Sequence, residues 1–263
     1  REDALEFYKR FYAPNNATLI LAGDVSVDDV RPMVEAAYGK IPPQPSIPPR
    51  RIRPQEPTPA GPRTVTLADP RVEQPSVRRY YLVPSAVTAA PEQSAALEVL
   101  AQLMGTGSNS MLYRALVVDK PLAVSAGAWY QGTGVDPTQF GISASPKPGV
   151  EFPQVEQAID EVIAKLAQAP VPAEDLERTK TQMIAQAVYA QDSQTTLARW
   201  YGAAITVGLS VDDVRAWPDR IRAVTAEQVR EAAQKWLDKK RSATGYLIKE
   251  SAAATAKREE KRS

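Results

Sequence analysis

The residue types that usually carry hydrolytic chemistry are informative here because two of them are missing. The 263 residues include no His and no Cys. His is the usual general base of Ser and Cys hydrolases and a frequent zinc ligand, while Cys supplies thiolate nucleophiles, zinc ligands and disulfides. Carboxylate acid–base chemistry, a Lys nucleophile, a Ser–Lys pair and binding without catalysis all remain open. The sequence thus nominates no catalytic residue and no metal ligand in this chain.

Adjacent carboxylates are the remaining candidates for acid–base chemistry. They occur at Asp28–Asp29, Glu174–Asp175 and Asp212–Asp213. Each pair falls in the first turn of a predicted helix, where acidic groups interact favourably with the helix dipole. We interpret the pairs as helix-capping residues. Neither they nor any Ser–Lys pair has a recognised catalytic spacing, so an independent enzyme of that kind is not favoured.

A turn rich in Gly and Ser at residues 105–110 invites comparison with a phosphate-binding loop. No Gly-Lys-Ser/Thr follows it, and the segment before it has a helical pattern where a phosphate loop requires a strand. A simpler interpretation, a flexible turn that ends the preceding helix, explains the same residues.

Charge and hydropathy exclude two classes of partner. The chain has 32 Lys and Arg against 31 Asp and Glu, a net charge of +1. A nucleic-acid-binding surface needs basic residues clustered on one face, which the sequence does not provide. No apolar run approaches the roughly 18 residues of a membrane span. We therefore expect no nucleic acid partner and no membrane span, whereas the lack of Cys is compatible with any compartment.

The elements that would position a site begin close to the first residue. The chain opens at Arg1, directly on the amphipathic pattern of a helix that runs to Tyr12, so it is expected to be part of a longer protein. The turn after that helix leads to a predicted buried strand at 17–23 and a helix capped by Ser26. Prolines crowd residues 42–62, which we interpret as an extended linker.

A longer unit of strands and helices follows the linker. Strands are predicted at 64–67, 77–83, 123–130, 139–144 and 243–248, and helices at 91–104, 111–118, 155–166, 176–201, 211–217 and 225–237. This order indicates an α+β fold, a mostly antiparallel sheet with helices packed on one face.

A weak internal repeat indicates two related domains. The helix-then-strand unit at Ala4–Gly23 recurs at Val229–Ile248, with Phe11-Tyr12 matching Trp236-Leu237. The offset is about the size of one domain. The chain is therefore expected to hold one complete domain and the helix-strand-helix end of a preceding homologous one.

Two segments carry a family resemblance. Residues 7–25, FYKRFYAPNNATLILAGDV, resemble the closing segment of the zinc-bearing domain of the pitrilysin/insulinase metallopeptidases, which include the mitochondrial processing peptidases. Residues 107–116, GSNSMLYRAL, followed by LAVSA at 122–126, resemble the start of that family's second, non-catalytic domain. The resemblance implies two similar α+β domains that close around an unfolded peptide, with an inverted H-x-x-E-H motif holding zinc in the first.

The resemblance also divides the chain. It implies that residues 1–41, before the Pro-rich linker at 42–62, are the C-terminal end of the zinc-type domain and that 63–250 are the non-catalytic substrate-enclosing domain. The polar, charged composition of residues 251–263 predicts a disordered tail. The turn at 105–110 then resembles a shorter form of the glycine-rich loop of the processing-peptidase α subunit.

The chain departs from the family at its functional positions. Without His, no zinc ligand can be placed on any residue, so zinc is expected in the missing half of the parent protein or in a partner. The family's substrate-steadying Arg and Tyr fall on Val117 and Val124. Arg114, one turn before Val117, is a candidate substitute, although a solvated helix charge is its simpler interpretation. Tyr113 and Tyr130 are weaker candidates for substrate contact, because wall or core positions are usual for such aromatics.

These expectations converge on a function without catalysis in this chain. The leading hypothesis is the substrate-enclosing half of a zinc metallopeptidase that degrades unfolded peptides. The alternative is a non-catalytic subunit that binds a separate zinc-bearing subunit. Expected partners are a peptide substrate and a zinc-bearing domain or subunit, with a homodimer as a further candidate. A bacterial periplasmic or cell-envelope location is suggested by analogy alone.

Overall fold

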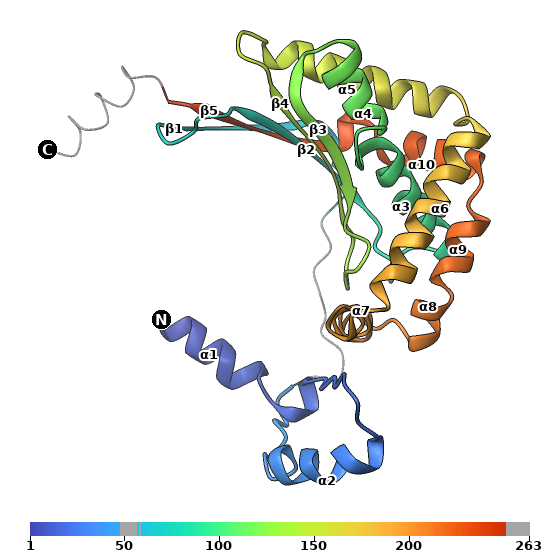
Figure 1. The fold of residues 1–263 in the computed structure, drawn as a ribbon. Coiled ribbons are helices and arrows are strands. Elements are labelled where there is room, and N and C mark those ends of the chain that lie inside the picture. The colour runs from blue at the N-terminus through green and yellow to red at the C-terminus, as the bar shows by residue number, and fades with distance from the viewer. Residues whose placement is uncertain (48–56, 58, 251–263) are drawn as a thin grey trace, which may run out of the picture. The chain divides into compact units, whose positions relative to one another are not determined.

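The computed structural model describes residues 1–47, 57 and 59–250, whose elements are labelled in Figure 1. They form two compact units, 1–47 and 57 with 187–215, and 59–186 with 216–250. Much of the predicted linker and the whole predicted tail lie outside the described residues. Over the part of the chain that is described, no helix has both the length and the apolar composition needed to cross a membrane.

The first unit is built from helices. They are α1 (Glu2–Phe11), the short 3₁₀ turn η1 (Pro14–Asn16), α2 (Val27–Tyr38), α7 (Gln194–Val207) and α8 (Val211–Arg215). The predicted cap of α2 is confirmed, since the Asp29 backbone N–H donates to Ser26 Oγ at 3.2 Å. No residue of α1 or α2 is buried. Apolar side chains on both helices, among them Phe7 and Met33, are therefore left exposed to solvent.

The strand predicted at 17–23 is wrong for this chain. Residues 17–22 form neither helix nor strand, and all but Ile20 are exposed. A strand exists only through hydrogen bonds to a neighbouring strand, and no described segment pairs with these residues. Ile20 instead contacts α7, where a Cβ on Gly202 would stand 2.6 Å from Ile20 Cδ1.

The second unit contains one five-stranded sheet. Its strands are β1 (Arg63–Asp69), β2 (Ser76–Val83), β3 (Ala123–Tyr130), β4 (Thr138–Pro146) and β5 (Ser242–Lys249). Their order across the sheet is β1-β5-β2-β4-β3. Only the β1–β5 pair is parallel, so the predicted, mostly antiparallel sheet is confirmed.

Helices cover one face of this sheet, as predicted (Figure 1). The helical segments of this part of the chain are α3 (Pro91–Gly105), α4 (Met111–Tyr113), the π-helix η2 (Arg114–Asp119), α5 (Phe152–Gln168), α6 (Ala173–Ala190), α9 (Trp217–Ala223), α10 (Ala226–Trp236) and the 3₁₀ turn η3 (Lys239–Arg241). Their apolar residues and the facing strand residues form the core, with Tyr81, Phe140, Leu97, Leu100 and Ile159 among its fully buried side chains. Each such side chain contributes about 1.5–3 kcal/mol through burial.

Two helix predictions need correction. The single helix expected at 176–201 is two helices, α6 and α7. The break occurs because Ser193 Oγ accepts a hydrogen bond from the Thr196 N–H at 3.2 Å and so begins a new helix. The helix α9 follows α8 and was not predicted. By contrast, all three carboxylate pairs lie in first helical turns, as interpreted from the sequence.

The helix layer approaches the sheet very closely at the end of α3. An ideal Cβ on Gly105 would stand 1.8 Å from the Ala128 backbone nitrogen. Only a residue without a side chain permits this approach. Gly105, the first residue of the turn at 105–110, is therefore required for the packing of α3 against β3 as well as being the last residue of α3.

Candidate functional site

The two faces of the sheet differ in what covers them. Along β2, Val77, Arg79 and Tyr81 are buried beneath the helices, whereas Arg78 is exposed and Tyr80 is half-buried. Successive residues of a strand point to opposite faces. The even-numbered residues of β2 therefore mark a face that no described helix of this unit covers (Figure 1). We call it the uncovered face.

One row of paired residues crosses the uncovered face. From β1 to β3 it consists of Arg63, Ala243, Tyr80, Gly141 and Trp129. An ideal Cβ on Gly141 would stand 2.3 Å from the Trp129 ring, so the indole lies directly over this glycine. The Tyr80 and Trp129 rings meet edge-on, with 5.8 Å between centroids and 79° between planes. The row thus presents an aromatic pair near β3 and a cation at β1.

Charge on the uncovered face is mainly positive. Arg63 and Arg78 are both exposed there. Among the strand residues on this face, Asp69 is the acidic one, and Arg71 Nη2 contacts its Oδ2 at 2.8 Å. Val65, 67% exposed, and Leu67, 61% exposed, add apolar surface. An extended chain carrying apolar side chains and negative charge would complement this surface.

The valines at the family's Arg and Tyr positions lie on two irregular backbone segments. Val117 is half-buried in the π-helix η2, and its side chain packs against the core. Val124 is 46% exposed in β3, where the pairing with β4 shifts between Ala123 and Ser125. Such β-bulges redirect a side chain. Arg114, the candidate substitute, is exposed in the first turn of η2.

The structure separates the candidate tyrosines from the uncovered face. Tyr130 pairs with the buried Phe140 and so points toward the helices. Its hydroxyl donates to the Pro84 carbonyl at 2.7 Å. Burial is the main cause that raises the pKa of Tyr130 to about 12. Tyr113 is half-buried at the end of α4.

Trp129, the neighbour of Tyr130, is one of the site residues that sequence reasoning missed, together with Tyr80, Arg63 and Arg78. The signal was available in the alternation of the strand. Once Tyr130 is assigned to the core, Trp129 must point to the opposite face.

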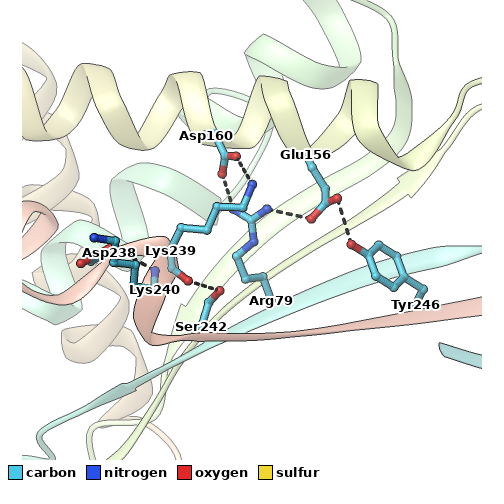
Figure 2. A network of polar contacts seen from close by, with 8 residues as sticks. All are labelled: Arg79, Glu156, Asp160, Asp238, Lys239, Lys240, Ser242 and Tyr246. Atoms are coloured by element: carbon cyan, nitrogen blue, oxygen red, sulfur yellow. Dashed lines mark hydrogen bonds and ion pairs between the residues drawn. The ribbon is translucent and has the colours of Figure 1, made fainter. Parts of the chain in front are cut away.

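The helix-covered face holds a polar network centred on Arg79 (Figure 2). Only 1% of its side chain is exposed, and its guanidinium bonds Glu156 Oε1 at 2.9 Å and also Asp160, both on α5. Tyr246 on β5 donates to Glu156 Oε2 at 2.9 Å, and Lys239 Nζ lies 2.7 Å from Asp160 Oδ2.

This network ties the sheet to α5. Burial alone would lower the pKa of Arg79, but Tyr81 and the two carboxylates more than reverse that effect, so the pKa is raised and the cation is retained. A buried cation without its carboxylates would be strongly destabilising. We therefore interpret the network as structural. In the described residues, no three His, Cys, Asp or Glu side chains form a group that could hold a metal ion.

Comparison with known sequences places this architecture among peptidase relatives. The sequence pattern of the family described as "Peptidase M16 inactive domain" matches residues 1–183. The zinc protease PqqE of Helicobacter pylori is 25% identical over 199 residues, which cover 75% of this chain and 44% of that protein. The chain therefore spans less than half the length of this curated relative.

Solved structures share the fold. The crystal structure of a protease from Helicobacter pylori matches with a TM-score of 0.86 at 20% identity, covering 94% of this chain and 58% of that one. The periplasmic protease PqqL from Escherichia coli matches with a TM-score of 0.71 at 16% identity, covering 99% of this chain and 30% of that one. Both likenesses establish the fold of the chain.

Proposed function

Because the chain belongs to the family of peptidase M16 inactive domains, we propose that it is the non-catalytic, substrate-enclosing half of a zinc metallopeptidase. The observation that carries the proposal is the uncovered face. Helices cover one side of the sheet, and the other side carries an aromatic pair and exposed apolar residues. An exposed apolar surface of this kind usually marks a binding site for another molecule or domain. An unfolded peptide is the occupant that fits a long, open surface of this kind.

The uncovered face would hold a peptide through its row of paired residues. Trp129 and Tyr80 supply large, rigid aromatic surface that gains affinity with little loss of side-chain freedom. Arg63 and Arg78 would favour peptides with acidic groups. The chain's own residues would bind and orient the peptide and exclude water around it, while hydrolysis would occur elsewhere.

Zinc chemistry belongs, in this proposal, to residues outside this chain. A zinc-bearing domain of the same protein would supply the metal that activates water. The first unit supports this arrangement, because residues 17–22 are the repeat counterpart of β5, which pairs on both sides in its own sheet. We propose that residues 1–41 complete the sheet of the zinc-type domain and that 17–22 become a strand there.

A second arrangement keeps the same face and changes the partner. The zinc would then lie on a separate subunit, which the exposed apolar side chains of α1 and α2 would help to bind. A homodimer is the third candidate assembly. The reading frame upstream of Arg1 separates the first two, since an H-x-x-E-H motif there places zinc in the same protein and its absence places zinc in a partner.

The same proposal includes a location. A structural neighbour is named as a periplasmic protease. We propose the bacterial periplasm or cell envelope for this chain as well. Fractionation of cells that express the full-length protein, followed by immunoblotting, tests the location, and recovery with the cytoplasmic fraction would contradict it.

Peptide binding to this chain tests the central proposal. The probe is an unstructured, fluorescein-labelled peptide, and binding is followed by fluorescence anisotropy. Trp129→Ala should weaken binding by about 10-fold or more, the usual effect of removing a buried aromatic contact. Trp200→Ala is the matched control, because Trp200 lies in the other unit. Equal losses for the two variants, or no binding by the unmodified chain, would refute the proposal.

A further inference from the structure

One end of the uncovered face is hollowed into a cavity of about 380 Å³. It lies where β2 ends and where β1, β4 and β5 begin. The side chains that matter to the argument are Tyr80, Leu82, Gln139, Arg63 and Arg241. Tyr80 belongs both to the cavity and to the aromatic pair, so the cavity is continuous with the row that crosses the face.

The cavity is basic. Arg63 and Arg241 line it, and the described residues around it include no Asp or Glu. Its other polar side chains, such as Gln131, Gln139 and Thr138, are neutral hydrogen-bonding groups. A cavity of this composition favours an anionic group small enough to be held by two guanidinium groups and a few amides.

The two arginines come from neighbouring segments of the chain. Arg63 at the start of β1 pairs with Ala243 of β5, and Arg241 is the last residue of the 3₁₀ turn η3, two residues before Ala243. Both arginines line the same cavity. Two long side chains that line one cavity can bind one carboxylate together.

Arg241 is also held in place. Its guanidinium lies over the Trp236 ring, 5.0 Å from the centroid, and Nη1 donates to the Lys235 carbonyl at 3.4 Å. Its Nε is buried and has no acceptor among the described residues. A buried donor without an acceptor is unfavourable unless a ligand supplies one.

We propose that this cavity binds the C-terminal carboxylate of the enclosed peptide. The inference rests on the proposed function and adds the direction in which the peptide binds. The row from Trp129 to Arg63 is about 19 Å long, the length of about six extended residues. A peptide lying along it places apolar side chains on Trp129 and Tyr80 and its terminal carboxylate between Arg63 and Arg241. Binding of the C-terminal carboxylate in the cavity would set the position of every other peptide residue along the uncovered face.

The test compares one peptide in two forms, with a free C-terminal carboxylate and with a C-terminal amide. Anisotropy titrations of the full chain should give a free acid that binds about 10-fold more tightly than the amide, as expected for charge-assisted hydrogen bonds to one carboxylate. Arg63→Gln should reduce this ratio to below about 3-fold. Arg241→Lys, which keeps the charge and removes the planar fork, should also lower the ratio.

Arg78→Gln is the matched control. Arg78 is exposed on the same face but does not line the cavity. Its loss should weaken both peptide forms alike and leave their ratio unchanged. If Arg78→Gln lowers the ratio as much as Arg63→Gln, the general charge of the face is responsible and the cavity assignment is wrong.

A second measurement follows the Arg241 Nε–H resonance by NMR. The free-acid peptide should shift it and the amide should not. Equal affinities for the two forms, or an unmoved resonance, would overturn the carboxylate site while leaving peptide enclosure intact, provided Trp129→Ala still weakens binding. Failure of both forms to bind would instead remove the proposed function, and the carboxylate site with it.

Discussion

The indole of Trp129 fills the space above Gly141 and meets the ring of Tyr80 edge-on, with 5.8 Å between the ring centroids. The aromatic pair therefore depends on a residue that has no side chain. Gly141 lies between them in the sheet, paired with Tyr80 on one side and with Trp129 on the other. The shape of the uncovered face is set as much by this missing side chain as by the rings.

Gly141→Ala should displace the indole. The new Cβ would stand 2.3 Å from the Trp129 ring, a distance that requires the ring to move. Overpacking of this kind lowers the free energy of unfolding by about 1–3 kcal/mol. Chemical denaturation measures the loss, and a changed indole resonance of Trp129 reports the displacement.

Gly245→Ala provides the comparison for that variant. Gly245 lies on the same face, and its Cβ would stand 3.6 Å from Val65 Cγ1, an ordinary contact. Its effect on stability should be smaller than that of Gly141→Ala. Equal losses would mean that strand glycines in general, rather than the Trp129 contact, set the cost.

Arg79→Gln should destabilise the second unit strongly. It would leave Glu156 and Asp160 without their buried cation, at an expected cost of about 3 kcal/mol. The adjacent Arg78→Gln removes the same charge from an exposed position and should change stability by less than about 0.5 kcal/mol. Urea unfolding of both variants checks the difference. Similar midpoints would show that the network contributes little.

Gly105→Ala tests the close approach of α3 to β3. A Cβ at this position would overlap the Ala128 backbone, which cannot rotate away as a side chain can. We expect a loss of at least about 3 kcal/mol, the upper end of overpacking effects. Gly61→Ala is the control, because no atom lies within 4 Å of its added Cβ. Thermal unfolding of the two variants separates packing from the general effect of replacing glycine.

A half-buried carboxylate gives the second unit a pH-dependent stability. Glu98 on α3 accepts a hydrogen bond from the Trp217 indole N–H at 2.6 Å. Burial raises the pKa of Glu98, and the Trp217 bond and the charge of Arg220 oppose that rise only in part. The folded state therefore favours the protonated acid. Its contribution to stability is complete below the ordinary Glu pKa and is lost as pH rises through the raised value.

Glu98→Gln should remove this dependence while keeping an acceptor for Trp217. The melting temperature of the variant relative to the unmodified chain should increase between about pH 4 and about pH 7 by a few degrees. Calorimetry at several pH values measures the trend. A constant difference, or one that shrinks with rising pH, would contradict a raised pKa at Glu98.

Much of the fold follows from local sequence signals. The capping box formed by Thr225 and Gln228 marks the start of α10 in both the sequence and the structure. Proline, glycine and alternating apolar residues locate the strands of the second unit to within a few residues. These signals depend on residues that are close in sequence, so they predict an element correctly without knowledge of its long-range contacts.

The features that were missed depend on distant neighbours. Residues 17–22 have the composition of a strand, but a strand needs a partner, and its repeat counterpart β5 has two. Nothing near Arg79 in the sequence indicates that Glu156 and Asp160 will surround it. The role of Trp129 likewise depends on Gly141, which is its neighbour only because β3 pairs with β4.

The position of β5 has a consequence for how the molecule is made. This strand is the last element of the described chain, yet it lies inside the sheet, between β1 and β2. During synthesis β1 emerges early and has no neighbour until β5 follows at the other end of the unit. Strand pairs between residues far apart in sequence form slowly, and the unpaired edge of a strand can aggregate before its partner is available. Nascent chains should therefore depend on chaperones until residue 249 has left the ribosome.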